Sequence, residues 1–234
     1  FTAMVEALLH WLPMLGVLLG AGAVGGLLAG LLGVGGGIVI VPVLDAALNL
    51  AGVSPDASLH VAVATSMATI IPTSISSSRS HAQRGSVDPD IVKRWSVPIV
   101  AGALAGALAA SRVDARVLAA VFGCVAAAVA LKMVLPLDHL VLRRTIPGGP
   151  AGAAIPATIG AVAAMMGIGG GVLSVPIMTL CGEPMHKAVG TGAQLGFWIS
   201  VPATAGYLLA PAPDAASLPL TIGYVSLLGF AVIA

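Results

Sequence analysis

The sequence carries the same glycine-rich phrase twice, and this duplication limits the folds open to the chain. GVGGGIVIVPV occupies residues 33–43, and GIGGGVLSVPI occupies residues 167–177. A second matched pair follows these phrases, HVAVATS at 60–66 and HKAVGTG at 186–192. Two related halves, each with a glycine break in an apolar stretch, are the pattern of transporters built from internal repeats. We therefore predict a chain that folds as two related halves.

The composition predicts a membrane protein. Charged residues make up 8% of the chain, against about 25% in ordinary soluble domains, and the mean hydropathy is +1.06. Residues 12–44, 58–78 and 95–111 contain no Asp, Glu, Lys or Arg, and a helix needs roughly 20 apolar residues to span a bilayer. We expect an all-α, multi-pass protein in the lipid bilayer. The net charge of +1 argues against a nucleic-acid partner.

The apolar pattern also gives a plan of the helices. The predicted segments are 12–32, 38–51, 58–80, 91–111, 114–135, 151–166, 172–182, 187–210 and 220–234. Segments 38–51 and 172–182 are too short to cross a core of about 30 Å at 1.5 Å per residue. Both follow a glycine cluster directly, so we expect half-helices that begin inside the membrane and meet at a central site. The predicted division is a first repeat at 1–135, a cytoplasmic linker at 136–150 and a second repeat at 151–234, incomplete at its C-terminal end.

The distribution of basic residues predicts how the two repeats are oriented. The loop at 79–94 and the linker at 136–150 carry the strongest basic clusters, which indicates that both are cytoplasmic. The loop of the second half that corresponds to 79–94, at 210–220, has no Lys or Arg. Opposite charge bias at equivalent loops favours inverted repeats over parallel ones. The basic residues in question are Arg79, Arg84, Lys93, Arg94, Arg143 and Arg144.

The glycine clusters are the first candidate binding residues. Glycine leaves the backbone N–H groups uncovered, and the start of a helix presents such groups with a partial positive charge. The clusters therefore predict an anion site. The alternative is close helix packing, which small residues also allow. The candidate glycines are Gly33, Gly35, Gly36, Gly37, Gly167, Gly169, Gly170 and Gly171.

Uncharged polar side chains in the second motif form the next group of candidates. Thr65, Ser66 and Thr69 lie in the segment at 58–80, and Thr191 and Gln194 lie in the matching segment. Their hydroxyl and amide groups could donate hydrogen bonds to the oxygens of an anion without a buried charge. The alternative is a hydroxyl that bonds back to a carbonyl of its own helix, which is common in membrane helices.

Three titratable residues are candidates for proton coupling. His60 and His186 begin the second motif in the two halves, and Asp45 lies in the first half-helix. An imidazole near a transport site could couple proton movement to transport. The alternative for both histidines is a position at the membrane interface. The sequence has no motif that predicts a cofactor or a metal site.

The motifs together resemble a known family. GLLGVGGGIVIVPVL, then HVAVATS, then SHAQRGSVDPD are similar to the sulfite exporter TauE/SafE family, and MMGIGGGVLSVPIM with PMHKAVGTG resembles its repeat. The resemblance covers about residues 20–230. It implies a permease that moves sulfite, sulfonates or other small organic anions across the inner membrane. The implied functional positions are the eight glycines with Thr65, Ser66 and Thr191. Gly192 stands where a serine is usual.

Three classes of function are open at this point. A secondary transporter that works by alternating access explains the repeats, the broken helices and the polar motifs together. A passive anion channel uses similar parts but commonly has a continuous polar pore, which no predicted helix supplies. An intramembrane enzyme would need a nucleophile with a base, or a metal cluster, and no such motif is present. The expected partners are a small anion and the lipid bilayer, and a homo-oligomer is left open.

Overall fold

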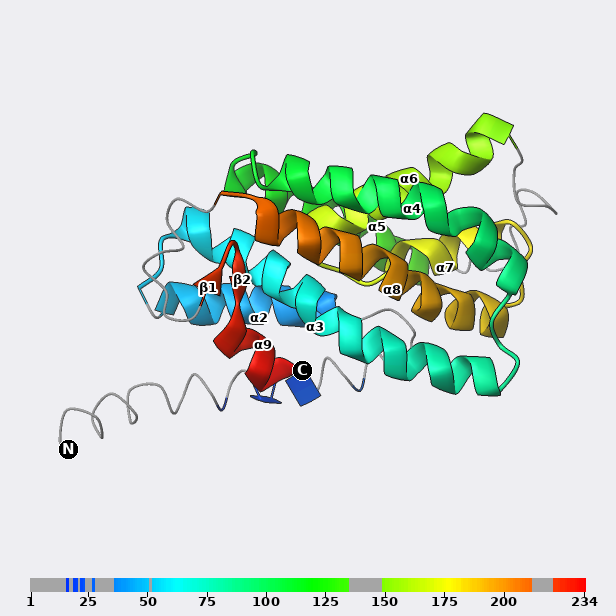
Figure 1. Ribbon diagram of the computed structural model, residues 1–234, viewed down its shortest axis with the longest axis horizontal. Coiled ribbons are helices and arrows are strands. Elements are labelled where there is room, and N and C mark those ends of the chain that lie inside the picture. The colour runs from blue at the N-terminus through cyan, green and yellow to red at the C-terminus, as the bar shows by residue number, and fades with distance from the viewer. Residues whose placement is uncertain are drawn as a thin grey trace.

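The computed structural model describes residues 36–50, 52–134, 149–211 and 221–234, together with residues 16, 19, 20, 22, 23 and 27. Helices make up nearly all of this part of the chain (Figure 1). Their order is α2 (Gly37–Leu50), α3 (Pro55–Gln83), α4 (Pro89–Ala110), α5 (Ala115–Val134), α6 (Gly149–Met166), α7 (Gly171–Leu180), α8 (Met185–Leu209), β1 (Thr221–Ile222), β2 (Val225–Ser226) and α9 (Leu227–Ile233).

The predicted half-helices are confirmed as short helices, since α2 and α7 each begin at the last glycine of a cluster. The helix predicted at 220–234 is wrong at its start. Residues 221–226 form a two-stranded hairpin, and the helix begins only at Leu227. The reason is the turn at Gly223, which has φ of 56° and leaves the helical region. The predicted segment at 12–32, Gly33, Gly35 and the basic residues of the linker lie largely or wholly outside the described residues.

Two of the described helices are long and apolar enough to cross a membrane, namely α3 and α4. Large apolar side chains lie exposed on the outside of the helices, including Leu50, Val97, Leu131 and Leu209. Such a surface costs free energy in water and none in lipid hydrocarbon. The structure thus agrees with the predicted all-α membrane protein.

The long helices run along the long axis of the molecule (Figure 1). The helices α4 and α8 point the same way, because the start of α4 contacts the start of α8 at Asp88 and Thr191, and Ala107 lies against Gly206 near their ends. A short turn joins α3 to α4 and reverses the chain direction. It follows that α3 and α8 run antiparallel to each other.

Glycines set the contact between α4 and α6. A Cβ atom on Gly102 would lie 1.9 Å from the carbonyl oxygen of Ala157, and one on Gly106 would lie 2.3 Å from that of Ala161. Gly160 meets the backbone of α4 equally closely. Small residues spaced four apart allow such backbone contact in membranes, where the hydrophobic effect does not drive helices together. The interface therefore depends on the absence of these Cβ atoms.

Replacement of Gly102 tests this contact. Gly102→Ala forces a methyl group against main-chain atoms that cannot rotate away, so we expect a loss of roughly 1–3 kcal/mol in unfolding free energy. Thermal unfolding of the protein in detergent measures the loss as a lower midpoint. Gly123→Ala on α5 is the control, because no described atom lies within 4 Å of its new Cβ. Equal midpoints for the two variants would contradict the packing argument.

Candidate functional site

The two glycine segments meet inside the protein. A Cβ atom on Gly37 would lie 2.1 Å from the carbonyl oxygen of Gly167 and 2.8 Å from the Cα of Ile168. The start of α2 thus lies directly against the segment that leads into α7. The described glycines of both clusters are buried, namely Gly36, Gly37, Gly167, Gly169, Gly170 and Gly171.

From this meeting point the half-helices extend to opposite ends of the molecule (Figure 1). The helix α2 leads into the start of α3, where His60 contacts Ala110 at the C-terminal end of α4. The helix α7 leads into the start of α8, where Thr191 contacts Asp88 at the N-terminal end of α4. The N-termini of both half-helices therefore point to the centre from opposite sides.

Close packing explains part of the glycine content. Gly167 has φ of 67°, and a Cβ atom there would lie 2.8 Å from Cγ2 of Val41. A Cβ atom on Gly170 would lie 2.7 Å from the amide nitrogen of Gly196 on α8. Gly170 is also the N-cap residue of α7, and no side chain caps this helix start. The same glycines thus allow tight packing and leave the first turn of α7 without a side-chain acceptor.

Three hydroxyl groups near the glycines donate hydrogen bonds to carbonyl oxygens of the backbone. Ser66 donates to the carbonyl of Gly167 at 2.7 Å, which joins α3 to the second glycine segment. Thr69 donates to the carbonyl of Ser66 at 2.8 Å, within its own helix. Ser174 donates to the carbonyl of Gly170. The hydroxyl of Thr69 therefore bonds back to a carbonyl of its own helix. The hydroxyl of Ser66 instead holds the backbone of the second glycine segment.

The hydroxyls of Thr65 and Thr191 behave differently, because both accept hydrogen bonds. Thr65 Oγ1 accepts from the backbone N–H of Ser226 at 3.0 Å, and Thr191 Oγ1 accepts from the backbone N–H of Asp88 at 2.9 Å. Both side chains are fully buried. A hydroxyl that accepts in this way keeps its own hydrogen for donation. Within the described part of the chain, that hydrogen has no acceptor in either residue. Gln194 lies half-buried one turn beyond Thr191.

His60 is the buried member of the histidine pair. Its Nδ1 lies 2.7 Å from the carbonyl oxygen of Asp56, and its Nε2 lies 3.1 Å and 3.0 Å from those of Ala110 and Val113. Both ring nitrogens thus face hydrogen-bond acceptors. A neutral imidazole has one N–H and satisfies only one side, whereas the protonated ring donates from both nitrogens. The ring of Tyr224 lies beside it, with centroids 5.5 Å apart.

The other titratable candidates lie apart from the glycine segments. His186 is exposed at the start of α8. Asp45 is half-buried near the end of α2, where its Oδ1 accepts a hydrogen bond from Ser58 of α3 at 2.5 Å. Asp45 therefore closes the hairpin between the half-helix and the long helix of the first half.

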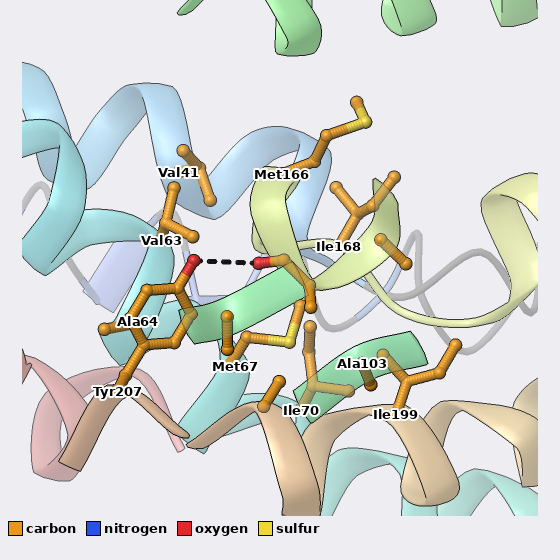
Figure 2. Packing of buried hydrophobic residues seen from close by; sticks show 14 of the residues in the cluster. Val41, Val63, Ala64, Met67, Ile70, Ala103, Met166, Ile168, Ile199 and Tyr207 are labelled. Carbon is orange, nitrogen blue, oxygen red and sulfur yellow. Dashed lines mark hydrogen bonds between the residues drawn. The ribbon is translucent and has the colours of Figure 1, made fainter. Parts of the chain in front are cut away.

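A dense apolar core surrounds the second glycine segment (Figure 2). Val63, Ala64 and Met67 of α3 face Met166 and Ile168 there. Besides the bond from Ser66, the Tyr207 hydroxyl of α8 donates across this core to the carbonyl of Ala164 at 3.1 Å (Figure 2). The carbonyl lies in the last turn of α6, just before the glycines. Sequence reasoning missed this tyrosine because it lies outside the motifs that the two halves share.

Sequence reasoning also missed Asp88 and Ser226, although a pattern contains them. Residues 85–88 read GSVD and residues 223–226 read GYVS, so both end in a common N-cap residue after a glycine and a valine. This third matched pair is too short to be noticed in the sequence alone. In the structure, its last residues contact Thr191 and Thr65.

Comparisons with known proteins agree on one family. The model of the family described as "Sulfite exporter TauE/SafE" matches residues 18–234. A "Probable membrane transporter protein" of Haemophilus influenzae is 30% identical over 208 residues, which is 88% of this chain and 78% of that protein. No solved structure matches the chain.

Removal of the Ser66 hydroxyl tests its role on the glycine backbone. Ser66→Ala leaves the buried carbonyl of Gly167 without this donor, so we expect a loss of about 1–3 kcal/mol in unfolding free energy. Thr69→Val is the matched control one turn later, because the carbonyl that its hydroxyl contacts lies within a helix. A thermal shift equal to that of the control would show that the bond from Ser66 to Gly167 does not hold the glycine segment.

Proposed function

Because the chain belongs to the sulfite exporter TauE/SafE family, we propose that it is a secondary transporter of small sulfur-containing or organic anions. Membership of this family makes the protein a membrane transporter and not an enzyme. The proposal adds the chemistry of the substrate, such as sulfite or a sulfonate, the inner membrane as its location, and alternating access as its mechanism.

The observation that carries the proposal is the pair of buried hydroxyls at Thr65 and Thr191. Each oxygen accepts from a backbone N–H, and among the described residues neither hydroxyl hydrogen has an acceptor, so each can donate to a ligand. The uncapped start of α7 adds backbone N–H groups at Gly169–Gly171. Each of these groups is a donor, so each threonine can bind an oxygen of the anion on its own side of the glycine segments.

The absence of buried formal charge supports an anion that is carried and released. Among the described residues, the buried polar set contains no Lys, Arg, Asp or Glu. A buried lysine or arginine would form a strong pair with a sulfonate and slow its release. Neutral donors and helix dipoles favour the anion more weakly. Such binding fits a carrier whose site must empty on the far side.

The orientation of the two halves supports alternating access. The helices α3 and α8 carry the matched motifs HVAVATS and HKAVGTG, and they run antiparallel. The half-helices α2 and α7 also extend to opposite ends (Figure 1). Equivalent elements in opposite directions are what inverted repeats require, and inverted repeats can exchange conformations around a fixed central site.

Sulfite and a panel of sulfonates and carboxylates test the proposal directly. We expect saturable, gradient-coupled uptake into vesicles and a ligand-dependent rise in the thermal unfolding midpoint. Thr191→Val keeps the shape but removes the donor, so affinity should fall by about 1.5–3 kcal/mol, or roughly ten- to 150-fold. Thr191→Ser is the control that restores the donor. Linear, gradient-independent flux would favour the channel, and unchanged affinity in both Thr65→Val and Thr191→Val would place the site elsewhere.

We propose His60 as the proton-coupling residue, in preference to His186 and Asp45. His60 is buried, and its two ring nitrogens face three carbonyl oxygens, so protonation changes how many of them it can satisfy. The titratable and charged groups on the elements around it are Asp56 on α3, Arg112 and Asp114 in the α4–α5 turn, Arg116 on α5 and Tyr224 beside β2.

Matched replacements of the two histidines test the coupling. His60→Gln cannot take up a proton on the side chain, so an imposed pH gradient should no longer drive anion uptake. Exchange of anion for anion should persist, because it needs no net proton movement. His186→Gln at the equivalent, exposed position should behave like the parent. Gradient-driven uptake that survives in His60→Gln would remove His60 from the coupling step.

A further inference from the structure

The third matched pair has the same local structure in both halves. In GSVD at 85–88 and GYVS at 223–226, the glycine adopts φ of 66° and 56°. The last residue is in each case the N-cap of the next helix. Asp88 Oδ1 accepts from the N–H groups of Asp90 and Ile91 at the start of α4, and Ser226 Oγ accepts from that of Gly229 in α9.

Each N-cap is bound by a threonine of the other half. The backbone N–H of Asp88, in the first half, donates to Thr191 in the second. The backbone N–H of Ser226, in the second half, donates to Thr65 in the first. We call these two contacts the Asp88 clasp and the Ser226 clasp. They are reciprocal, since each half supplies one threonine and one N-cap.

Small residues bring each clasp together. A Cβ atom on Gly190, next to Thr191, would lie 2.2 Å from the carbonyl oxygen of Ser86. In the other clasp, a Cβ atom on Gly229 would lie 3.1 Å from Cγ2 of Thr65. Both contacts depend on glycine, and the tighter of the two is backbone against backbone. The fold therefore brings each loop onto the opposite half by close contact as well as by a hydrogen bond.

The clasps lie at opposite ends of the long axis (Figure 1). The β1–β2 hairpin, which holds the Ser226 clasp, is at one end, and the connection between α3 and α4, which holds the Asp88 clasp, is at the other. The long helices follow this axis, so in a membrane its two ends face the two aqueous sides. One clasp therefore closes the protein toward each side.

We propose that the Asp88 clasp and the Ser226 clasp are the two gates of the transporter and that they open in turn. This inference rests on the proposed function in that it assumes alternating access. Each clasp joins a helix of one half to the other half, so a movement of the halves toward one side must break one clasp and can keep the other. Both are closed here, which corresponds to an occluded state. Asp88 and Ser226 are then positioning residues, because they hold the threonine hydroxyls that face the substrate.

Matched cysteine reporters can follow the two gates. Val87 and Val225 occupy the same position in the two motifs, directly before the N-cap. Val87→Cys and Val225→Cys would be placed singly in a background with Cys124→Ala and Cys181→Ala. A membrane-impermeant maleimide, added to one side of oriented vesicles at a time, measures how fast each thiol is labelled. No substrate is present in this assay.

We expect Thr191→Val to raise the labelling rate of Val87→Cys, from the side of the α3–α4 connection. Loss of one neutral hydrogen bond predicts roughly a two- to tenfold rise. Labelling of Val225→Cys should fall below its rate in the parent, because opening one gate removes molecules from the state in which the other is open. Thr65→Val should give the reverse pattern from the opposite side. Thr191→Ser and Thr65→Ser should label like the parent.

The fall at the distant reporter separates a gate from local fraying. A rise at the near reporter alone, a rise at both reporters, or no change at either would overturn the proposal. Failure of the proposed function looks different, since the reporters would alternate as expected while no anion on the panel binds or moves. The opposite failure is equally distinct, with saturable anion uptake but no alternation of the reporters.

A second pair of variants breaks the Ser226 clasp without a change at Thr65. Ser226 has φ of −80°, which proline tolerates. Ser226→Pro removes the donated N–H and the cap oxygen, whereas Ser226→Ala removes the cap oxygen alone. We expect Ser226→Pro to label Val225→Cys faster than Ser226→Ala does, by a factor similar to that of Thr65→Val. Equal labelling in the two would show that the bond to Thr65 does not close this end.

Discussion

The contact between the two glycine segments is the constraint on which the rest of the structure depends. Backbone that leaves a helix inside a membrane needs partners from the protein, because lipid offers none. Here Gly37 lies against Gly167, and Ser66 supplies a donor to the carbonyl of Gly167. Any Cβ atom at this contact would separate the segments and expose their polar groups. The half-helices can therefore begin at the centre only because the glycines let the two breaks cover each other.

The threonine hydroxyls join the two halves at the ends of the molecule, as the glycine segments do at the centre. A hydroxyl has one hydrogen to donate and two lone pairs to accept. Thr65 and Thr191 each use a lone pair to hold the other half's N-cap, and neither hydrogen has an acceptor in the described part of the chain. One side chain can thus contact a ligand and the opposite half at once. This is the property that a carrier needs if binding at the centre is to affect closure at an end.

Much of this could be predicted from the sequence, and the remainder has clear physical reasons. The short helices α2 and α7 followed from glycine clusters in apolar runs, and Thr65 and Thr191 followed from a duplicated motif. The hairpin at 221–226 was predicted as helix because its residues are apolar, whereas the positive φ at Gly223 is a local backbone property. Thr69 is predicted as a site residue from the same motif, and its hydroxyl bonds within its own helix in the structure. Hydrogen-bond partners such as Ser226 and Thr65 are far apart in the sequence, so the spacing of residues does not predict that they meet.

The departures from symmetry between the halves both act on the second glycine segment. Ser66 of the first half corresponds to Gly192, and Ser174 of the second half corresponds to Ile40. Compared with the first half, the second half lacks a hydroxyl on its long helix and has one on its half-helix. A Cβ atom on Gly192 would lie 3.2 Å from the Ser174 hydroxyl oxygen, so glycine at 192 makes room for it. Both hydroxyls serve the second glycine segment, Ser66 at the Gly167 carbonyl and Ser174 at that of Gly170. The second glycine segment thus receives one hydroxyl donor from each half, Ser66 on α3 and Ser174 on α7.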